Sequence, residues 1–343
     1  MSIKFHKVLI TGSAGFIGFS ISQKLLLENF SVLGVDNLNS YYDLNLKKQR
    51  HKILKKNKNF IEIIGNIEED KFIEKILIEY KPNYIIHLAA QAGVRYSLEK
   101  PDDYLNSNII GTYKILNALK KTKVKHFLFA STSSVYGNTY DFPYYENSRT
   151  DCPISFYAAT KKSCEIITHT YSHLYKIPTT VFRFFTVYGP WGRPDMALFK
   201  FTKLILSNKQ IDIYNNGNMK RDFTYIEDLV EAIFKLMSSI PTNKLNKEIK
   251  NDTISAVAPW RVVNIGNQKP INLLDFIKIL EKCLNKKAIY NFLSIQPGEV
   301  LNTFSNCDLL FELTNFRPNT QLEEGIKKFL DWYLTYNKIE IKF

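Results

Sequence analysis

Cysteine and long apolar runs are both scarce in this chain. Among 343 residues the only cysteines are Cys152, Cys164, Cys283 and Cys307. They form no Cys-x-x-Cys pair, and no histidine stands at the spacing of a zinc ligand, so the sequence indicates neither a metal site nor a disulfide scaffold. The apolar run at 8–10 is too short for the core of a signal peptide, and no stretch approaches the roughly 18 apolar residues of a membrane span. We therefore expect reduced thiols, a cytoplasmic location and no membrane partner.

Acidic residues are outnumbered as well, since 46 Lys and Arg against 33 Asp and Glu leave a net charge of +13. Such a balance admits nucleic acid, an acidic membrane surface or small anionic ligands as partners. The lysines are spread along the chain, and the densest clusters, at 47–50 and 55–56, are typical of a solvated helix face. Nucleic-acid binding would need a continuous basic face with exposed aromatic residues. The interspersed pattern lacks this, so we expect no nucleic-acid partner.

The first half of the chain alternates short apolar runs with longer helical patterns. The runs lie at 7–10, 31–36, 60–64, 84–88, 127–130 and 179–184. Alternation of this kind predicts βαβ units, and nearly continuous apolar character predicts strands covered by helices on both faces. The sequence therefore predicts an α/β fold with a doubly wound parallel sheet, the Rossmann type.

Beyond about residue 185 the pattern loosens, with Gly, Pro and Asn between shorter elements. The segments 226–237 and 261–265 are typical of a helix and a strand that return to the first domain. We predict a Rossmann domain made of residues 1–185 and 224–265, and a smaller C-terminal α/β substrate domain made of 186–223 and 266–343.

The first predicted strand runs into a glycine-rich turn that opens a helix. Gly12, Gly15 and Gly18 permit a tight turn and let backbone N–H groups approach a pyrophosphate at the positive end of the helix. An acid, Asp36, follows 18 residues beyond Gly18, at the end of the second predicted strand. Its carboxylate can accept hydrogen bonds from a ribose diol and would repel a 2′-phosphate. This context favours NAD over NADP.

A second motif places a phenol and an ammonium four residues apart, at Tyr157 and Lys161, on one face of a predicted helix. By proximity, the Lys161 charge would lower the pKa of Tyr157 towards working pH, so that the phenolate could act as a base. Tyr96 has the same spacing to Lys100, but Pro101 would end a helix there. Thr132 lies in a Ser/Thr-rich turn at the C-terminal end of a predicted strand, where open parallel sheets bind ligands.

The glycine turn, Asp36, Thr132, Tyr157 and Lys161 together resemble an extended short-chain dehydrogenase/reductase over nearly the whole chain. Three longer segments, at 87–97, 183–196 and 221–225, narrow the resemblance to the UDP-glucuronate 4-epimerases, a family of NAD-dependent isomerases. The resemblance implies C4 epimerisation of UDP-glucuronate to UDP-galacturonate through a 4-keto intermediate, as a supply of precursors for cell-surface polysaccharide. It also implies a homodimer formed through two long helices, near 106–121 and 157–175.

Residue roles follow from the same resemblance. Tyr157 would remove the proton of the sugar 4-hydroxyl, Thr132 would hydrogen-bond O4, and Lys161 would hold the nicotinamide ribose. The expected NAD contacts are Gly12, Gly15, Phe16, Ile17, Gly18, Asp36, Asn37, Asn66, Ile67, Leu88, Ala89, Ala90, Tyr157 and Lys161. The expected substrate contacts are Arg95, Thr132, Ser133, Ser134, Thr186, Arg193, Met196, Asn216, Arg221 and Glu299.

Two of these positions depart from the family pattern. Asn66 stands where the family has an Asp as an adenine contact, and Glu299 stands where Pro-Gly-Asp is common. The substrate carboxylate makes the 4-keto intermediate a β-keto acid, which loses CO2 when the carboxylate bond aligns with the carbonyl π system. We expect Thr132, Ser133, Ser134 and Arg193 to hold that carboxylate out of alignment, since arginine offers an always charged two-point fork.

Several alternatives stay open at this point. A UDP-glucuronate decarboxylase shares the substrate and the first step, and the sequence separates the two activities only in the Arg193 region. An uncharged UDP-hexose could be the substrate, although the expected carboxylate holders argue against it. Sugar 4,6-dehydratases carry Asp-Glu after the catalytic Thr, whereas Ser133 and Ser134 stand there in this chain. A regulator that only senses NAD would have no need for Thr132, Tyr157 and Lys161 together.

Overall fold

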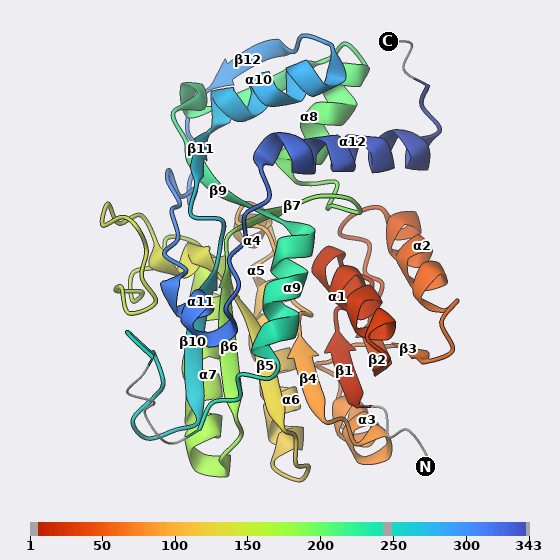
Figure 1. The fold of residues 1–343 in the computed structure, drawn as a ribbon, viewed down its shortest axis with the longest axis vertical. Helices are drawn as coiled ribbons and strands as arrows, with labels where there is room; N and C mark the ends of the chain where they lie inside the picture. The colour runs from red at the N-terminus through yellow and green to blue at the C-terminus, as the bar shows by residue number, and fades with distance from the viewer. Residues whose placement is uncertain (1–5, 243–248, 341–343) are drawn as a thin grey trace.

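The computed structural model describes residues 6–242 and 249–340 of the chain. Its main element is a seven-stranded parallel sheet with the strand order β10-β6-β5-β4-β1-β2-β3 (Figure 1). The strands are β1 (Lys7–Thr11), β2 (Ser31–Asp36), β3 (Phe60–Ile64), β4 (Tyr84–His87), β5 (His126–Thr132), β6 (Thr179–Phe184) and β10 (Trp260–Ile265). All six predicted runs are strands, and the predicted fold class is confirmed.

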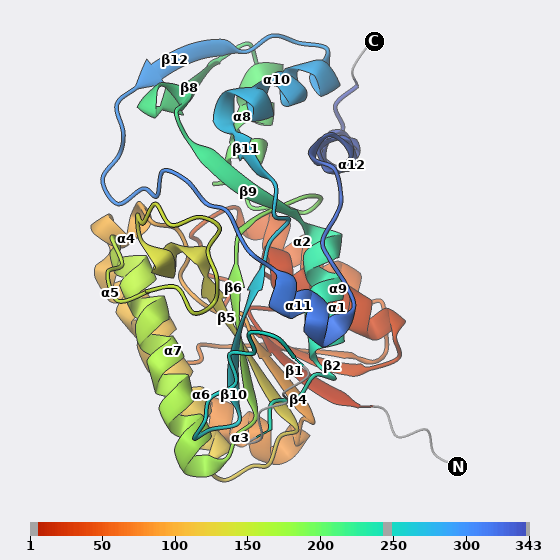
Figure 2. The same cartoon turned by 60° about the vertical axis from the view of Figure 1, so that its left-hand side comes forward.

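Helices cover both faces of this sheet (Figure 2). One face carries α3 (Phe72–Tyr80), α6 (Gly111–Leu119) and α7 (Phe156–Tyr175), and the other carries α1 (Phe16–Leu27) and α9 (Ile226–Leu236). Side chains alternate along each strand, so Leu9 packs with the first group whereas Val8 and Ile10 pack with the second. Because helices cover both faces, β1, β5 and β6 are buried along nearly their whole length, as the sequence pattern predicted, whereas the edge strand β3 is partly exposed.

Elements from the C-terminal half of the chain build a smaller part above the carboxyl ends of the strands (Figure 1). A three-stranded sheet contains β7 (Thr186–Tyr188), β9 (Lys220–Tyr225) and β11 (Pro270–Asn272), and a parallel pair contains β8 (Gln210–Tyr214) and β12 (Ile289–Leu293). Helices α8 (Ala197–Leu206), α10 (Leu273–Leu284) and α12 (Leu322–Asn337) accompany them. Short helices complete the chain: α2 (Leu44–Leu54), α4 (Tyr96–Glu99), α5 (Pro101–Tyr104), η1 (Leu105–Ile110), η2 (Ser133–Tyr136), η3 (Asn215–Gly217) and α11 (Asp308–Thr314).

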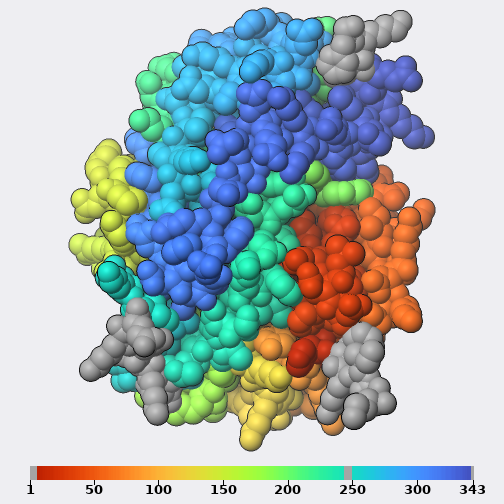
Figure 3. Space-filling model, viewed as in Figure 1, coloured from red at the N-terminus to blue at the C-terminus, as the bar shows by residue number. Residues whose placement is uncertain are grey.

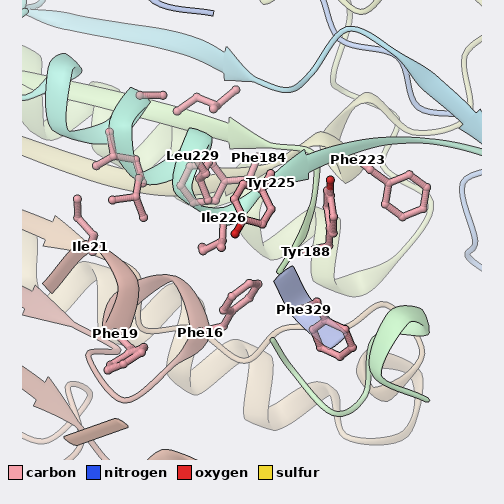
Figure 4. Close-up of a cluster of buried hydrophobic side chains, with 14 of the residues drawn as sticks. Phe16, Phe19, Ile21, Phe184, Tyr188, Phe223, Tyr225, Ile226, Leu229 and Phe329 are labelled. Atoms are coloured by element: carbon pink, nitrogen blue, oxygen red, sulfur yellow. The ribbon is translucent and has the colours of Figure 1, made fainter. Parts of the chain in front are cut away.

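One continuous apolar core joins the two parts. Figure 4 shows Phe16 of α1 facing Ile226 of α9, with Tyr188, Phe223 and Phe329 of the smaller part close by. In Figure 3 the dark blue residues of α11 and α12 lie across the boundary between the two parts, and α11 contacts α9. The position of the smaller part over the sheet is therefore fixed by packing.

The structure corrects two sequence predictions. The segment near 106–121 is not one regular helix, because η1 is a π-helix and only Gly111–Leu119 is α-helical. The predicted solvated helix face at 47–50 is wrong at both ends, since Lys47 and Arg50 are 5% and 0% exposed. Within the predicted domains, residues 1–5, 243–248 and 341–343 lie outside the described part of the chain.

In the part of the chain that the structure describes, no helix is both long and apolar enough to cross a membrane. The same residues contain no group of three or more His, Cys, Asp or Glu that could hold a metal ion.

Candidate active site

A cavity of about 720 Å³ lies between the carboxyl ends of the large sheet and the smaller part. Strand order reverses between β1 and β4, which is the point at which open parallel sheets bind ligands. Of the residues predicted to contact cofactor or substrate, all but two line this cavity. The exceptions are Asn66, whose neighbours Gly65 and Ile67 do line it, and Asn216, which is exposed in η3.

The glycine turn between β1 and α1 is packed too closely to carry side chains. Gly12 has φ +75°, and a Cβ there would lie 2.8 Å from the backbone nitrogen of Ala89. A Cβ at Gly18 would lie 2.0 Å from the carbonyl oxygen of Gly12. Helix α1 starts after Gly15 with no side chain capping its first N–H groups. The turn therefore leaves free donors at the positive end of a helix, which fits a bound pyrophosphate.

Asp36 holds this turn to the loop after β2. Its Oδ2 accepts from the backbone N–H of Ala14 at 3.0 Å, and its Oδ1 accepts from that of Leu38 at 2.8 Å. Beyond it, the Asn37 side chain donates to Oδ1 of Asn66 at 3.0 Å. These carboxylate and amide groups form a polar edge beside the turn, where the adenosine half of a dinucleotide fits.

The Tyr-Lys pair stands at the start of α7, as predicted. Ser155 caps this helix by accepting from the backbone N–H of Ala158 at 3.2 Å, and Tyr157 and Lys161 both line the cavity. Thr132, the last residue of β5, faces the same space, and its Oγ1 accepts from the backbone N–H of Ser134 at 3.2 Å. A strand end and a helix start thus bring the three predicted catalytic side chains together.

The electrostatics of the pair differ from the prediction. Burial raises the pKa of Tyr157, while the nearby Thr132 hydroxyl and the positive charge of Arg193 act to lower it. The fall in pKa predicted from Lys161 does not occur, and the Nζ of Lys161 donates to the Ala130 carbonyl oxygen at 2.8 Å. Burial also lowers the pKa of Lys161 to about 8. The charge that favours the phenolate here belongs to Arg193.

A buried ion pair, which the sequence did not lead us to predict, lies next to Thr132 and Lys161. Glu165, one helical turn after Lys161, accepts from both Nε and Nη2 of Arg183 on β6, at 3.0 and 2.9 Å. It also accepts from the hydroxyl of Ser131, beside Thr132, at 2.6 Å. The ion pair therefore ties α7 to β5 and β6 next to the side chains that are predicted to be catalytic. Glu165 follows Lys161 by four residues on the same helix face, and this spacing is the sequence signal that could have identified it.

Arg193 reaches the cavity from the loop between β7 and α8 and is paired with Asp195. Its Nε donates to Oδ1 of Asp195 at 3.0 Å, and its Nη2 donates to Oδ2. Tyr41, from the loop after β2, also donates to Oδ2 of Asp195, at 3.3 Å. Burial lowers the pKa of Arg193, but the Asp195 carboxylate raises it more, so the guanidinium stays charged. Sequence reasoning did not single out Asp195, which lies in the same segment, or Tyr41.

A second arginine spans the mouth of the cavity. Arg95 donates from Nε to Oε1 of Glu299 at 2.8 Å, and its guanidinium lies 4.1 Å from the ring centroid of Tyr214 in β8. Arg221, at the edge of β9, donates to the carbonyl oxygen of Leu301 at 2.8 Å and also lines the cavity. Three guanidinium groups thus surround one space, which suits a ligand with several negative charges.

The fold and the site define a class of protein. A doubly wound sheet, a glycine turn and a Thr-Tyr-Lys arrangement at the carboxyl ends of the strands are features of the short-chain dehydrogenase/reductases. The family model described as "GDP-mannose 4,6 dehydratase" matches residues 9–329. The chain belongs to the epimerase/dehydratase family of these proteins.

Particular relatives are similar over their whole length. The probable UDP-glucuronate 4-epimerase of Rhizobium meliloti (strain 1021) is 48% identical, with 95% of this chain and 96% of the relative covered. Protein CapI of Staphylococcus aureus is 47% identical, with 97% and 99% covered. The crystal structure of the UDP-glucuronic acid 4-epimerase from Bacillus cereus with UDP-glucuronic acid and NAD has a TM-score of 0.86 and 33% identity, and covers 96% of this chain and 99% of that one.

Proposed function

We propose that this protein is an NAD-dependent UDP-glucuronate 4-epimerase. The observation that carries the proposal is that Thr132, Tyr157, Lys161 and Arg193 line one cavity. Relatives named UDP-glucuronate 4-epimerase, at 41–48% identity, support it. A 4-epimerase needs a base for the 4-hydroxyl, and a substrate acid needs a fixed positive charge. The same cavity supplies both.

NAD, when bound, takes up the C4 hydride and returns it to the other face of the sugar. The chain holds the cofactor through the glycine turn and Asp36 at one end and through Lys161 at the other. Tyr157 accepts the proton of the 4-hydroxyl, and Thr132 fixes the oxygen from which that proton leaves. We assign the dinucleotide to the part made of residues 1–185 and 224–265 and the nucleotide sugar to 186–223 and 266–343.

Retention of CO2 separates this activity from a decarboxylase. Arg193 donates to Asp195 from Nε and Nη2. Among the residues that the structure describes, no hydrogen bond from its Nη1 is found, so this nitrogen is free to bind a ligand carboxylate. The hydroxyls of Ser133 and Ser134 line the same wall. These groups hold the carboxylate away from alignment with the C4 carbonyl. The diphosphate lies near Arg221, and Arg95 with Glu299 closes over the nucleotide.

We further propose a homodimer formed through η1, α6 and α7. Leu105 and Tyr113 are 41% and 43% exposed, and Ile166 and Leu174 on α7 are 58% and 59% exposed. Ile166 and Leu174 both lie on α7, and Leu105 and Tyr113 lie on η1 and α6, which both contact α7. An apolar face of this kind on two adjacent helices suits a second copy of the same chain. A cytoplasmic location and a supply role for cell-surface polysaccharide complete the proposal.

The deciding experiment incubates the purified protein with UDP-glucuronate and no added cofactor, and identifies the products by NMR. We expect UDP-galacturonate, with Tyr157→Phe as the inactive control that still binds cofactor. UDP-xylose or a 4-keto pentose with CO2 would assign the decarboxylase instead. No reaction after addition of NAD, together with turnover of UDP-galactose, would contradict the role of Arg193.

A further inference from the structure

Arg50 is a fully buried arginine outside the cavity, and its side chain is among the largest that are fully buried in the described part of the chain. It lies on α2, in the basic cluster that the sequence pattern assigned to a solvated face. Among the described residues no carboxylate lies within ion-pair distance of it, and its Nε has no hydrogen-bond partner. A buried charge without an opposite charge is unfavourable unless other contacts require it.

The contacts of Arg50 join two segments that are far apart in the sequence. Nη1 donates to the carbonyl oxygen of Ala14 and to the hydroxyl of Tyr42, both at 2.7 Å. Nη2 donates to the carbonyl oxygen of Trp191 at 2.6 Å and lies 3.4 Å from that of Gly192. Ala14 belongs to the glycine turn, and Trp191 lies two residues before Arg193 in the same loop. The planar side chain of Arg50 therefore bridges the glycine turn at 12–18, called the cofactor turn below, and the loop at 189–196, called the Arg193 loop below.

The Arg193 loop needs such a support because its backbone is strained. Trp191 has φ +62°, a left-handed conformation that bulky residues rarely adopt. Its ring is held by Phe19 of α1 and Trp332 of α12, both at 5.3 Å between centroids. Its carbonyl is held by Arg50. Fixing both the ring and the carbonyl of Trp191 sets the direction in which the chain enters Arg193.

We propose that Arg50 is a positioning residue that sets the place of Arg193 relative to the cofactor turn, and so controls whether the 4-keto intermediate is epimerised or loses CO2. This inference rests on the proposed function. If Arg193 shifts, the substrate carboxylate can align with the C4 carbonyl. The C5–C6 bond then breaks, CO2 leaves, and the electron pair passes into the carbonyl to give an enolate that takes up a proton at C5. The resulting 4-keto pentose either leaves, so that the C4 hydride stays on the cofactor as NADH, or receives the hydride back to give UDP-xylose.

The conservative variant Arg50→Lys tests this directly. A lysine keeps the positive charge, but its single ammonium group cannot reach Ala14 and Trp191 together as the planar fork does. We expect the ratio of decarboxylated to epimerised product, measured by NMR, to rise about 10-fold, as for the loss of one charge-assisted hydrogen bond. Arg149→Lys is the matched control, because Arg149 is exposed and pairs only with Asp151. It should leave the ratio unchanged.

Hydrogen exchange provides a readout that needs no turnover. The backbone N–H groups of Gly192 and Met196 bond to Gly189 and Arg193 at 3.1 Å each, within the Arg193 loop. In Arg50→Lys we expect faster exchange in 12–16 and in 189–196, with the rest of the sheet at wild-type rates. A purely structural role would lower the melting temperature and total turnover while leaving the product ratio unchanged.

The possible outcomes separate this inference from the proposed function. Unaltered exchange in 189–196, or an unaltered product ratio in Arg50→Lys, overturns the positioning role even if the wild type is an epimerase. A wild type that does not convert UDP-glucuronate contradicts the proposed function. In that case the exchange rates still decide whether Arg50 fixes the loop.

Discussion

The guanidinium of Arg193 and the carboxylate of Asp195 form a two-point ion pair inside the cavity. The pair occupies Nε and Nη2 of Arg193, and the hydroxyl of Tyr41 donates to the same Asp195 carboxylate at 3.3 Å. The same positive charge opposes the rise in the pKa of Tyr157 that burial causes. Arg193 therefore acts on both the proposed base and the proposed carboxylate site, and its replacement should alter both.

Arg193→Gln should move the acid limb of the pH profile to higher pH. Tyr157 must be deprotonated to act as a base, so kcat falls as pH drops below its pKa. Burial raises that pKa and Arg193 opposes the rise, so loss of the charge raises the pKa further. The profile of kcat against pH for UDP-glucuronate measures this. A limb that stays in place would show that Arg193 does not act on Tyr157.

Tyr157→Phe should abolish turnover and keep the protein folded and able to bind NAD. The ring still fits beside Tyr104, whose centroid is 6.0 Å away, and only the proton-accepting oxygen is lost. General-base catalysis typically contributes 10²–10⁴-fold, and we expect a fall of about 10³-fold. Initial rates and calorimetric NAD binding are the measurements. Wild-type turnover would exclude Tyr157 as the base, and the neighbouring variant Phe156→Leu, at an exposed site, serves as control.

Glu165→Gln should destabilise the fold by about 3 kcal/mol, because it leaves the buried Arg183 guanidinium without its opposite charge. Burial raises the pKa of Glu165, but Arg183 and Ser131 lower it more, so the carboxylate is ionised at neutral pH. The stability that a lowered carboxyl pKa confers is present above the unfolded pKa and is lost as pH falls through the folded one. Urea unfolding at pH 7 measures the difference. A loss below about 1 kcal/mol would mean that water reaches the pair.

His126→Gln should reduce the acid sensitivity of the protein. His126 is fully buried, receives the hydroxyl hydrogen of Thr180 at 2.8 Å, and has its pKa lowered by burial to about 4. Between its unfolded pKa of about 6.5 and this value only the unfolded chain takes up the proton, so stability falls as pH falls. Wild type should lose about 2 kcal/mol more than the variant between pH 7 and pH 5. Equal losses in urea unfolding would contradict this.

Much of the fold could be predicted because it is encoded locally. Strands covered on both faces are rich in apolar residues at successive positions, so the six apolar runs that form β1 to β6 can be recognised without any tertiary information. The glycine turn is visible for the same reason, since a Cβ at Gly12 or Gly18 would collide with backbone. That Tyr157 and Lys161 share one helix face follows from their four-residue spacing and helix geometry alone.

Only the tertiary structure decided how the charges are used. Arg50 and Lys47 lie in a basic cluster whose local pattern indicates a solvated face. Arg50 is nevertheless buried, and its hydrogen-bond partner, the carbonyl of Trp191, lies 141 residues further along the chain. Likewise, Lys161 has Tyr157 on its own helix face but donates to Ala130 on β5. Sequence spacing fixes which residues can meet within one helix or strand. The partner of a buried charge depends on which distant carbonyl or carboxylate the packed sheet and loops bring within reach, and no local pattern carries that information.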